Sequence, residues 1–215
     1  MKKSAIIVSC IILLLGIGYG FNTQVCSIMF PDIVDTLREV SAMSSETGRV
    51  VDENGKLLGN CYEEFQERCK ELFMEDSFDY YNYLTAMKAV LDNYSETSDV
   101  VISNELVSFR IQALWRTGDK IKARVKTKLL QKYVPYSQET QMYRAILSAG
   151  ESSVLYTLEK DSDGKWKVSQ SEIIKYEFDS PQRMGWTTEN YEKDFSTRQE
   201  ACNYLNILET SSVLG

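Results

Sequence analysis

The 215-residue chain contains no histidine, and this absence excludes much of enzyme chemistry. Ser-His-Asp and Cys-His nucleophile systems, HExxH metallopeptidases and histidine-ligated zinc sites all lack their central group. The sequence also lacks a G-x-S-x-G motif, a Walker A motif, a C-x-x-C pair and a G-x-G-x-x-G segment. Two facing carboxylates remain possible catalysts, but 31 acidic residues single out no pair. We therefore favour a protein that is not an enzyme and needs no cofactor.

Proline and glycine are also scarce, with three and eleven residues, which leaves little room for long disordered linkers. The apolar and charged fractions of 43% and 26% are ordinary for a folded protein. About 185 residues follow the first thirty, which is enough for one domain with a sizeable core. The net charge of −7 makes nucleic acid an unlikely partner for the chain as a whole.

The first thirty residues have the pattern of an export signal. Lys2 and Lys3 precede an uncharged, mainly apolar run from Ala5 to Phe21, and a second apolar patch extends from Val25 to Phe30. A run of 17 residues is slightly short for a spanning helix but long for a signal core, so residues 1–30 are either a signal peptide or a signal anchor. We expect residues 5–30 to enter the membrane and the domain 31–215 to lie outside, either tethered to the cell membrane or secreted after cleavage.

Four cysteines follow on the exported side, which permits two disulfides in three connectivities. Cys61 and Cys69 are predicted on one helix, about 12 Å apart by helical rise, so they cannot pair with each other. Any bridges would then join them to Cys26 and Cys202. The alternative is that all four are buried thiols without a disulfide.

Residues 31–99 are predicted to be mainly helical. Helices are expected from Pro31 to Gly48, from Cys61 to Met74, and after Asp76-Ser77, with a hairpin or loop over 49–58. The expected buried faces are Ile33, Val34, Leu37 and Val40 in the first helix; Tyr62, Phe65, Cys69, Leu72 and Phe73 in the second; and Phe78, Tyr81, Leu84, Leu91 and Tyr94 in the third.

Residues 100–178 change to a period of two, which predicts antiparallel strands. A three-residue loop over 117–119 would pair Trp115 with Ile121, Ile111 with Val125 and Val107 with Leu129. A two-residue loop would instead pair Trp115 with Lys122, and we favour the first register. Further strands are expected over 143–147, 154–158 and 166–178, with Trp115, Trp166 and Tyr176 facing inward. The tail 179–215 is predicted to contain a C-terminal helix over 188–208, with Tyr191, Phe195, Cys202 and Leu205 on one side.

The predicted order of elements resembles the nuclear transport factor 2-like, or cystatin-like, cone fold over residues 31–178. The segment Tyr156–Val168 looks like the last hairpin of many such domains in exported, membrane-anchored proteins of Gram-positive bacteria. The resemblance implies an α+β fold with helices packed on a curved antiparallel sheet. It also implies a setting in which some relatives are assembly factors of type IV secretion or conjugation machines. It carries no functional residue to this chain.

Basic residues alternate along the predicted hairpin. In the favoured register one sheet face carries Arg110, Arg116, Lys120, Lys122, Arg124, Lys126 and Lys128. Residues 110–132 hold eight bases against one acid, giving +7, whereas residues 31–79 hold thirteen acids against five bases, giving −8. Either this face binds an anionic partner, or it is the solvated side of an amphipathic sheet on which acids such as Glu151 and Glu159 fold over.

These patterns favour a non-catalytic, membrane-tethered extracytoplasmic domain that binds or scaffolds another envelope component, either a protein or an anionic polymer. One alternative is a small-molecule-binding or enzymatic cone-fold domain with a pocket at the mouth of the cone. Another is an accessory component of a secretion or conjugation machine.

Overall fold

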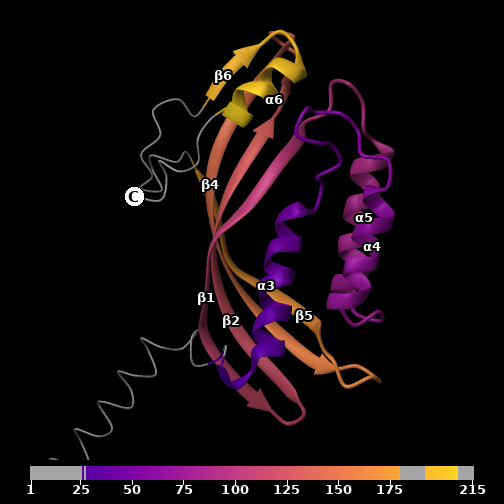
Figure 1. Cartoon of the computed structure of the whole chain (residues 1–215), viewed down its shortest axis with the longest axis vertical. Coiled ribbons are helices and arrows are strands. Elements are labelled where there is room, and N and C mark those ends of the chain that lie inside the picture. The colour runs from indigo at the N-terminus through magenta and orange to yellow at the C-terminus, as the bar shows by residue number, and fades with distance from the viewer. Residues whose placement is uncertain (1–25, 27, 180–191, 208–215) are drawn as a thin grey trace, which may run out of the picture.

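The computed structural model describes residues 26, 28–179 and 192–207. This part of the chain forms a mixed α+β fold with four helices and a six-stranded antiparallel sheet. Figure 1 shows α3, α4 and α5 on one side of a long, curved sheet, so the predicted α+β class is confirmed. Most of the predicted membrane segment, residues 1–25, lies outside the described residues. Among the helices that are described, none has the length and apolar character needed to span a membrane.

Three of the described helices lie close to where the sequence predicts them: α3 (Pro31–Glu46), α4 (Cys61–Leu72) and α5 (Phe78–Asp92). Pro31 occupies the first turn of α3, where its missing N–H costs no hydrogen bond. Ser77 caps α5 because its hydroxyl accepts a hydrogen bond from the Tyr80 amide at 3.2 Å. Between α3 and α4, Val51 and Leu57 form an antiparallel bridge that closes a tight turn at Gly55, whose φ of +78° suits glycine.

The predicted buried face is confirmed for α3 and wrong for part of α5. Ile33, Val34, Leu37 and Val40 are all at most 2% exposed. In α5, by contrast, Phe78 and Tyr81 are 79% and 60% exposed, and the buried side chains are Tyr80, Leu84 and Met87. These three follow the helical spacing of four and three residues, which turns Phe78 and Tyr81 toward solvent.

The sheet contains β1 (Val100–Thr117), β2 (Lys120–Val134), β3 (Tyr136–Ser137), β4 (Met142–Lys160), β5 (Trp166–Asp179) and β6 (Glu192–Phe195), and α6 (Arg198–Ile207) follows. β2 and β4 are central, β1 is one edge, and β5 and β6 share the other side of β4. Two predictions are corrected here. Residues 143–147 and 154–158 belong to the single strand β4, and Phe195 lies in β6 rather than in the final helix, which begins only at Arg198.

The favoured register of the β1–β2 hairpin is wrong at its tip. Thr117 pairs with Lys120 around a two-residue turn, so Trp115 lies opposite Lys122 and Arg116 lies opposite Ile121. An irregularity between Ile111 and Ala113 then shifts β1 by one residue and restores the predicted Ile111–Val125 pair. A further shift between Leu106 and Ser108 replaces the predicted Val107–Leu129 pair by Leu106–Leu129.

These shifts, and the exposure of the edges, also correct the expected position of two aromatic side chains. Trp115 is 41% exposed and shares a sheet face with Lys122 instead of pointing into the core. Tyr176, on the edge strand β5, is 59% exposed. Trp166 is partly buried and packs against the core as predicted.

The buried face of the sheet changes halfway along the strands. From the β1–β2 turn onward β2 buries the odd-numbered residues Ile121, Ala123, Val125, Thr127 and Leu129, whereas beyond them it buries Leu130 and Val134. The β2–β4 register runs without a shift through Leu129–Gly150 and Leu130–Ala149, whereas β1 is irregular between Leu106 and Ser108, opposite Leu129 and Lys128. We attribute the change of buried face to the twist that accumulates over such long strands. Because of the same twist, the series of exposed basic residues that alternate along β2 ends at Lys128. Burial lowers the pKa of the Lys132 ammonium.

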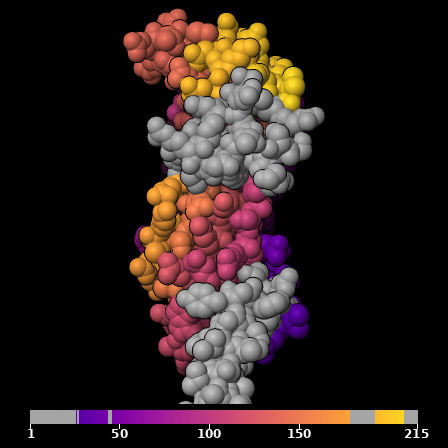
Figure 2. All heavy atoms as spheres, turned by 90° about the vertical axis from the view of Figure 1, so that its left-hand side faces the viewer, coloured from indigo at the N-terminus to yellow at the C-terminus, as the bar shows by residue number. Residues whose placement is uncertain are grey.

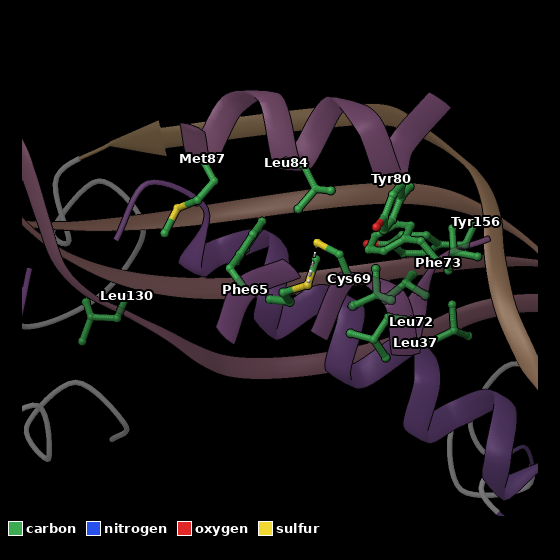
Figure 3. Packing of buried hydrophobic residues seen from close by; sticks show 14 of the residues in the cluster. Leu37, Phe65, Cys69, Leu72, Phe73, Tyr80, Leu84, Met87, Leu130 and Tyr156 are labelled. Atoms are coloured by element: carbon green, nitrogen blue, oxygen red, sulfur yellow. Dashed lines mark hydrogen bonds between the residues drawn. The ribbon is translucent and has the colours of Figure 1, made fainter. Parts of the chain in front are cut away.

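One hydrophobic core joins the helices to the sheet. Figure 3 shows Phe65, Cys69 and Leu72 of α4 in one core, with Leu37 of α3 beside Leu72, with Tyr80, Leu84 and Met87 of α5 above them, and with Tyr156 of β4 at one side. Phe73 is 0% exposed, and its ring centroid lies 5.1 Å from that of Tyr83. Ala201, Cys202 and Leu205 of α6 belong to the same core. The described residues therefore form one packed unit.

Candidate functional site

The sheet face turned away from α3, α4 and α5 carries most of the predicted basic residues. On β2 these basic residues alternate with buried ones, and on β1 Arg110 lies opposite the basic residue Lys126. We call the following set the basic face: Arg110, Lys120, Lys122, Arg124, Lys126 and Lys128. Figure 2 looks onto this side of the molecule, where side chains of β1 and β2 (magenta) lie beside those of β4 and β5 (orange). Arg110 is opposite Lys126, so the two strands place these cations side by side.

Arg116, which was predicted on this face, does not belong to it. The two-residue turn places Arg116 opposite Ile121, a residue of the buried face. The Arg116 Nε donates a hydrogen bond to the Gly118 carbonyl at 2.7 Å, which holds the guanidinium at the tip of the hairpin.

Two acids from β4 neutralise both ends of the basic face. The Lys120 ammonium lies 2.9 Å from Glu159, and Glu151 accepts from Lys126 at 2.7 Å and contacts Lys128 at 3.4 Å. The hydrogen bond from Lys126 is the main reason why the pKa of Glu151 is lowered, and the one from Lys120 does the same for Glu159. Folding over of Glu151 and Glu159, one of the two alternatives left open by the sequence, therefore occurs.

Between these acids, Lys122 and Arg124 form what we call the central patch. They lie opposite Thr157 and Leu155 of β4, neither of which is charged. The Arg124 Nε donates to the Ser153 hydroxyl at 3.3 Å. Within the part of the chain that the structure describes, no acid forms an ion pair with Lys122 or Arg124. On β2, the central patch is thus the stretch of the basic face whose cations have no acidic partner among the described residues.

A groove of about 670 Å³ opens at the end of the sheet where α3 begins. Its apolar lining comes from the start of α3 and from the ends of β1, β2 and β5, and its charged lining comes from β1, β4 and the β1–β2 turn: Phe30, Ile33, Leu114, Trp115, Ile121, Trp166, Arg116, Asp119, Glu159 and Lys160. The Lys160 ammonium lies 5.3 Å from the centre of the Trp166 ring, a cation–π distance. Sequence reasoning missed this groove because it placed Arg116 and Trp115 on the wrong faces.

A second hollow, of about 660 Å³, lies over the surface of α4 and α5. Tyr62, Tyr80 and Tyr81 line it together with Glu75, Lys88 and Asp92. Lys88 and Asp92 already pair with each other at 3.0 Å. Among the described residues, no hydrogen bond or ion pair directs the charged groups of this hollow toward a common point. The hollow therefore indicates no particular chemistry.

One acid is buried under α5. Asp79 is 7% exposed, its Oδ2 has no hydrogen-bond partner, and burial raises the pKa of its carboxyl while hydrogen bonds from Ser171 oppose that rise. Tyr156 is buried nearby, hydrogen-bonded to Ser41, and its pKa rises to about 12. A general acid must reach substrate, and Asp79 lines none of the grooves described above. Nothing in the sequence distinguishes Asp79 from the other acids in the first turns of helices.

None of the four described cysteines forms a disulfide. Cys69 lies 3.9 Å from the Met43 sulfur, and the Cys61 thiol donates to the Leu58 carbonyl at 3.4 Å. Burial raises the pKa of Cys69 and of Cys202 to about 11. Of the two alternatives, the structure has the one in which Cys26, Cys61, Cys69 and Cys202 are not bridged. In the residues described, no cluster of three cysteine, aspartate or glutamate side chains is arranged to hold a metal ion.

Comparison with known proteins adds little to this geometry. No protein-family model matches the chain, and no curated protein matches it. Among solved structures, the intermembrane space region of the chloroplast protein ARC6 superposes with a TM-score of 0.47 and 8% identity, over 65% of this chain and 91% of that one. A likeness of this size supports no conclusion about function.

Proposed function

We propose that this protein is a non-catalytic, membrane-tethered extracytoplasmic domain that binds an anionic envelope component through the central patch. The observation that supports this proposal is the contrast along β2: Lys120, Lys126 and Lys128 have acidic partners, whereas Lys122 and Arg124 have none among the described residues. Acidic residues at positions 155 and 157 would extend the ion pairs to Arg124 and Lys122, as expected for a face that only needs solvation. The chain has the uncharged residues Leu155 and Thr157 there instead.

The energetics favour an external anion at this position. Lys122 and Arg124 project from the same side of one strand, and unpaired like charges there cost a few tenths of a kcal/mol. A phosphate or carboxylate above the strand would relieve that repulsion, and Arg124 can offer it two parallel N–H donors. Arg124 already has its Nε on Ser153, which leaves the other guanidinium nitrogens to meet a partner.

The tether is the second part of the proposal. Lys2 and Lys3 precede the apolar run Ala5–Phe21, and such an arrangement keeps the lysines on the cytoplasmic side and sends the following domain outward. The likeness to nuclear transport factor 2-like cone domains of exported bacterial proteins remains part of this proposal. It is supported by helices lying along one side of a curved sheet, and a role as an accessory of an envelope machine would fit the same features.

A small-molecule-binding role is the second candidate, and the groove at the end of the sheet favours it. That groove is apolar over Trp115, Trp166 and Ile33, and it offers Arg116 and Lys160 as polar groups, which is the composition of many ligand sites. An enzymatic role would need a reacting group at this groove. Glu159, the groove's acid on β4, is already paired with Lys120.

The test is a binding titration across a salt series. The full chain would be reconstituted in nanodiscs of zwitterionic lipid and titrated with polyphosphate and with solubilised envelope fractions. The double variant Lys122→Glu/Arg124→Glu should lose binding, and a Lys122→Gln/Arg124→Gln form should lower the slope of log affinity against log salt by about two. The matched control is Lys56→Glu/Lys88→Glu, which changes the charge equally on the helix side of the molecule. Equal binding by both charge-reversed variants would refute the proposal.

A further inference from the structure

The end of the domain at which α3 begins exposes apolar side chains that a soluble surface would normally bury. Ile28, Met29 and Phe30 are 82%, 64% and 39% exposed, and Trp115 is 41% exposed. We call these four residues the hydrophobic rim. Figure 1 shows that the start of α3 and the tip of the β1–β2 hairpin lie at the same end of the molecule. Phe30 and Trp115 line one groove, so the rim is continuous across two segments far apart in the sequence.

Cations surround this rim in the manner of a membrane interface. Arg116 and Lys160 line the same groove as Phe30 and Trp115, and Lys122 lies opposite Trp115 on the neighbouring strand. Indole rings and basic side chains are the groups that concentrate at the headgroup level of bilayers. Glu159, one of the two acids in this groove, is neutralised by Lys120 at 2.9 Å.

The length of the connection to the apolar run brings this end close to the membrane. Five residue steps join Phe21 to Cys26, and a fully extended chain of that length spans at most about 18 Å. From Cys26 the chain is already helical toward α3, because the Phe30 amide donates to the Cys26 carbonyl at 2.8 Å. The headgroup layer adds about 5 to 7 Å on each side of the hydrocarbon core. If the apolar run spans the bilayer, the rim cannot move far from that layer.

We propose that the hydrophobic rim rests in the headgroup layer of a phospholipid bilayer, with Trp115 among the upper acyl segments and with Arg116 and Lys160 on lipid phosphates. This contact rests on the tether of the proposed function, because the short connection supplies the high local concentration that a small surface needs. The Nε of Arg116 is held by the Gly118 carbonyl at 2.7 Å, so its terminal nitrogens are pre-oriented at the hairpin tip.

The contact also fixes where the central patch meets its partner. Lys122 lies opposite Trp115 and so enters the headgroup layer beside it, and Arg124 is two residues, or about 7 Å, further along the strand. A domain resting on its rim therefore holds the central patch within reach of a polymer or protein lying on the membrane surface.

The test measures the depth of Trp115 in the membrane. The full chain would be reconstituted in nanodiscs of phosphatidylcholine and phosphatidylglycerol that carry bromine at shallow or deep acyl positions, which quenches tryptophan fluorescence on contact. The chain has three tryptophans, so the difference between wild type and Trp115→Phe isolates the signal of Trp115. Shallow bromine should quench this difference signal strongly and deep bromine weakly. A difference signal that neither lipid quenches would overturn the proposal.

Charge variants separate lipid binding from simple proximity. Arg116→Gln/Lys160→Gln should lower the ratio of domains whose rim contacts the bilayer to domains whose rim does not. On anionic lipid the ratio should fall roughly fivefold for each lost cation, and on phosphatidylcholine alone by much less. The control Lys56→Gln/Lys88→Gln has the same charge change on exposed residues away from the rim and should leave quenching unchanged. Equal effects of the two pairs would contradict a role for Arg116 and Lys160. A chain that does not enter the nanodisc would refute the tether, whereas a chain that enters without Trp115 quenching refutes only the rim contact.

Discussion

Replacing Glu151 by Gln should weaken the fold and strengthen anion binding at the same time. The Glu151 carboxylate lies 2.7 Å from the Lys126 ammonium and 3.4 Å from that of Lys128. Its side chain is 17% exposed, against 39% and 40% for the two lysines, so the pair is only partly screened by water. The two ion pairs, together with the repulsion between Lys126 and Lys128 that Glu151 offsets, contribute about 1 kcal/mol to the free energy of unfolding.

The pH dependence of this loss follows from the lowered pKa of Glu151. A folded-state pKa below the unfolded value near 4.5 means that the carboxylate stabilises the fold fully above that pH. The contribution then disappears as the pH falls through the lowered folded-state pKa. Urea unfolding of wild type and Glu151→Gln should therefore differ by about 1 kcal/mol at pH 7 and converge in acid.

The effect on binding has the opposite sign. Glu151 is four residues, or about 13 Å along the strand, from Leu155, the residue opposite Arg124. Removing one negative charge at that distance from a bound anion is worth about 0.3 kcal/mol in water, which is a factor of a little under two in affinity. Asp92→Asn is the control for stability, because Asp92 and its partner Lys88 are both more than half exposed and such pairs contribute little. Loss of binding in Glu151→Gln, or an equal loss of stability in both variants at pH 7, would refute the assignment of Glu151.

Three further variants test the packing and the buried charge. Phe73→Ala removes a ring that is 0% exposed and should cost about 3 to 5 kcal/mol in urea unfolding. Asp79→Asn should stabilise the fold by about 1 kcal/mol at pH 7, because burial raises the pKa of that carboxyl, and the gain should vanish below pH 3.8, where the acid is protonated in both states. Arg198→Ala removes hydrogen bonds to the Tyr94 hydroxyl at 2.6 Å and to the Ser98 carbonyl at 2.9 Å, so amide exchange should rise by tenfold or more in α6 and stay unchanged in α4.

The sequence predicts the helices well where one apolar face is unambiguous. In α3 the residues Ile33, Val34, Leu37 and Val40 have no apolar competitors on the opposite face, and all four are buried. In α5 aromatic residues occupy several faces, and hydrophobicity alone cannot choose between Tyr80 and its neighbour. The choice is made by tertiary contacts with α4 and β5.

The strand pattern predicts the sheet and most of the basic face, but not its details. The two-residue turn and the shift beyond Ile111 cancel each other, so alternation survives while Trp115 changes face. Neutralisation by Glu151 and Glu159 depends on the pairing of β2 with β4, a contact between residues more than twenty positions apart. The groove beside Phe30 brings α3 against four strand ends, and no local pattern encodes such an assembly.

Both proposals depend on the tether, so the topology of the full chain in its membrane is the most direct measurement. Membranes carrying the protein would be extracted with alkaline carbonate, and intact cells without their wall would then be treated with protease. The account predicts a carbonate-resistant chain whose domain, residues 31–215, is digested from outside while Lys2 and Lys3 remain protected. A chain released by carbonate, or a domain protected until the membrane is opened, would contradict it.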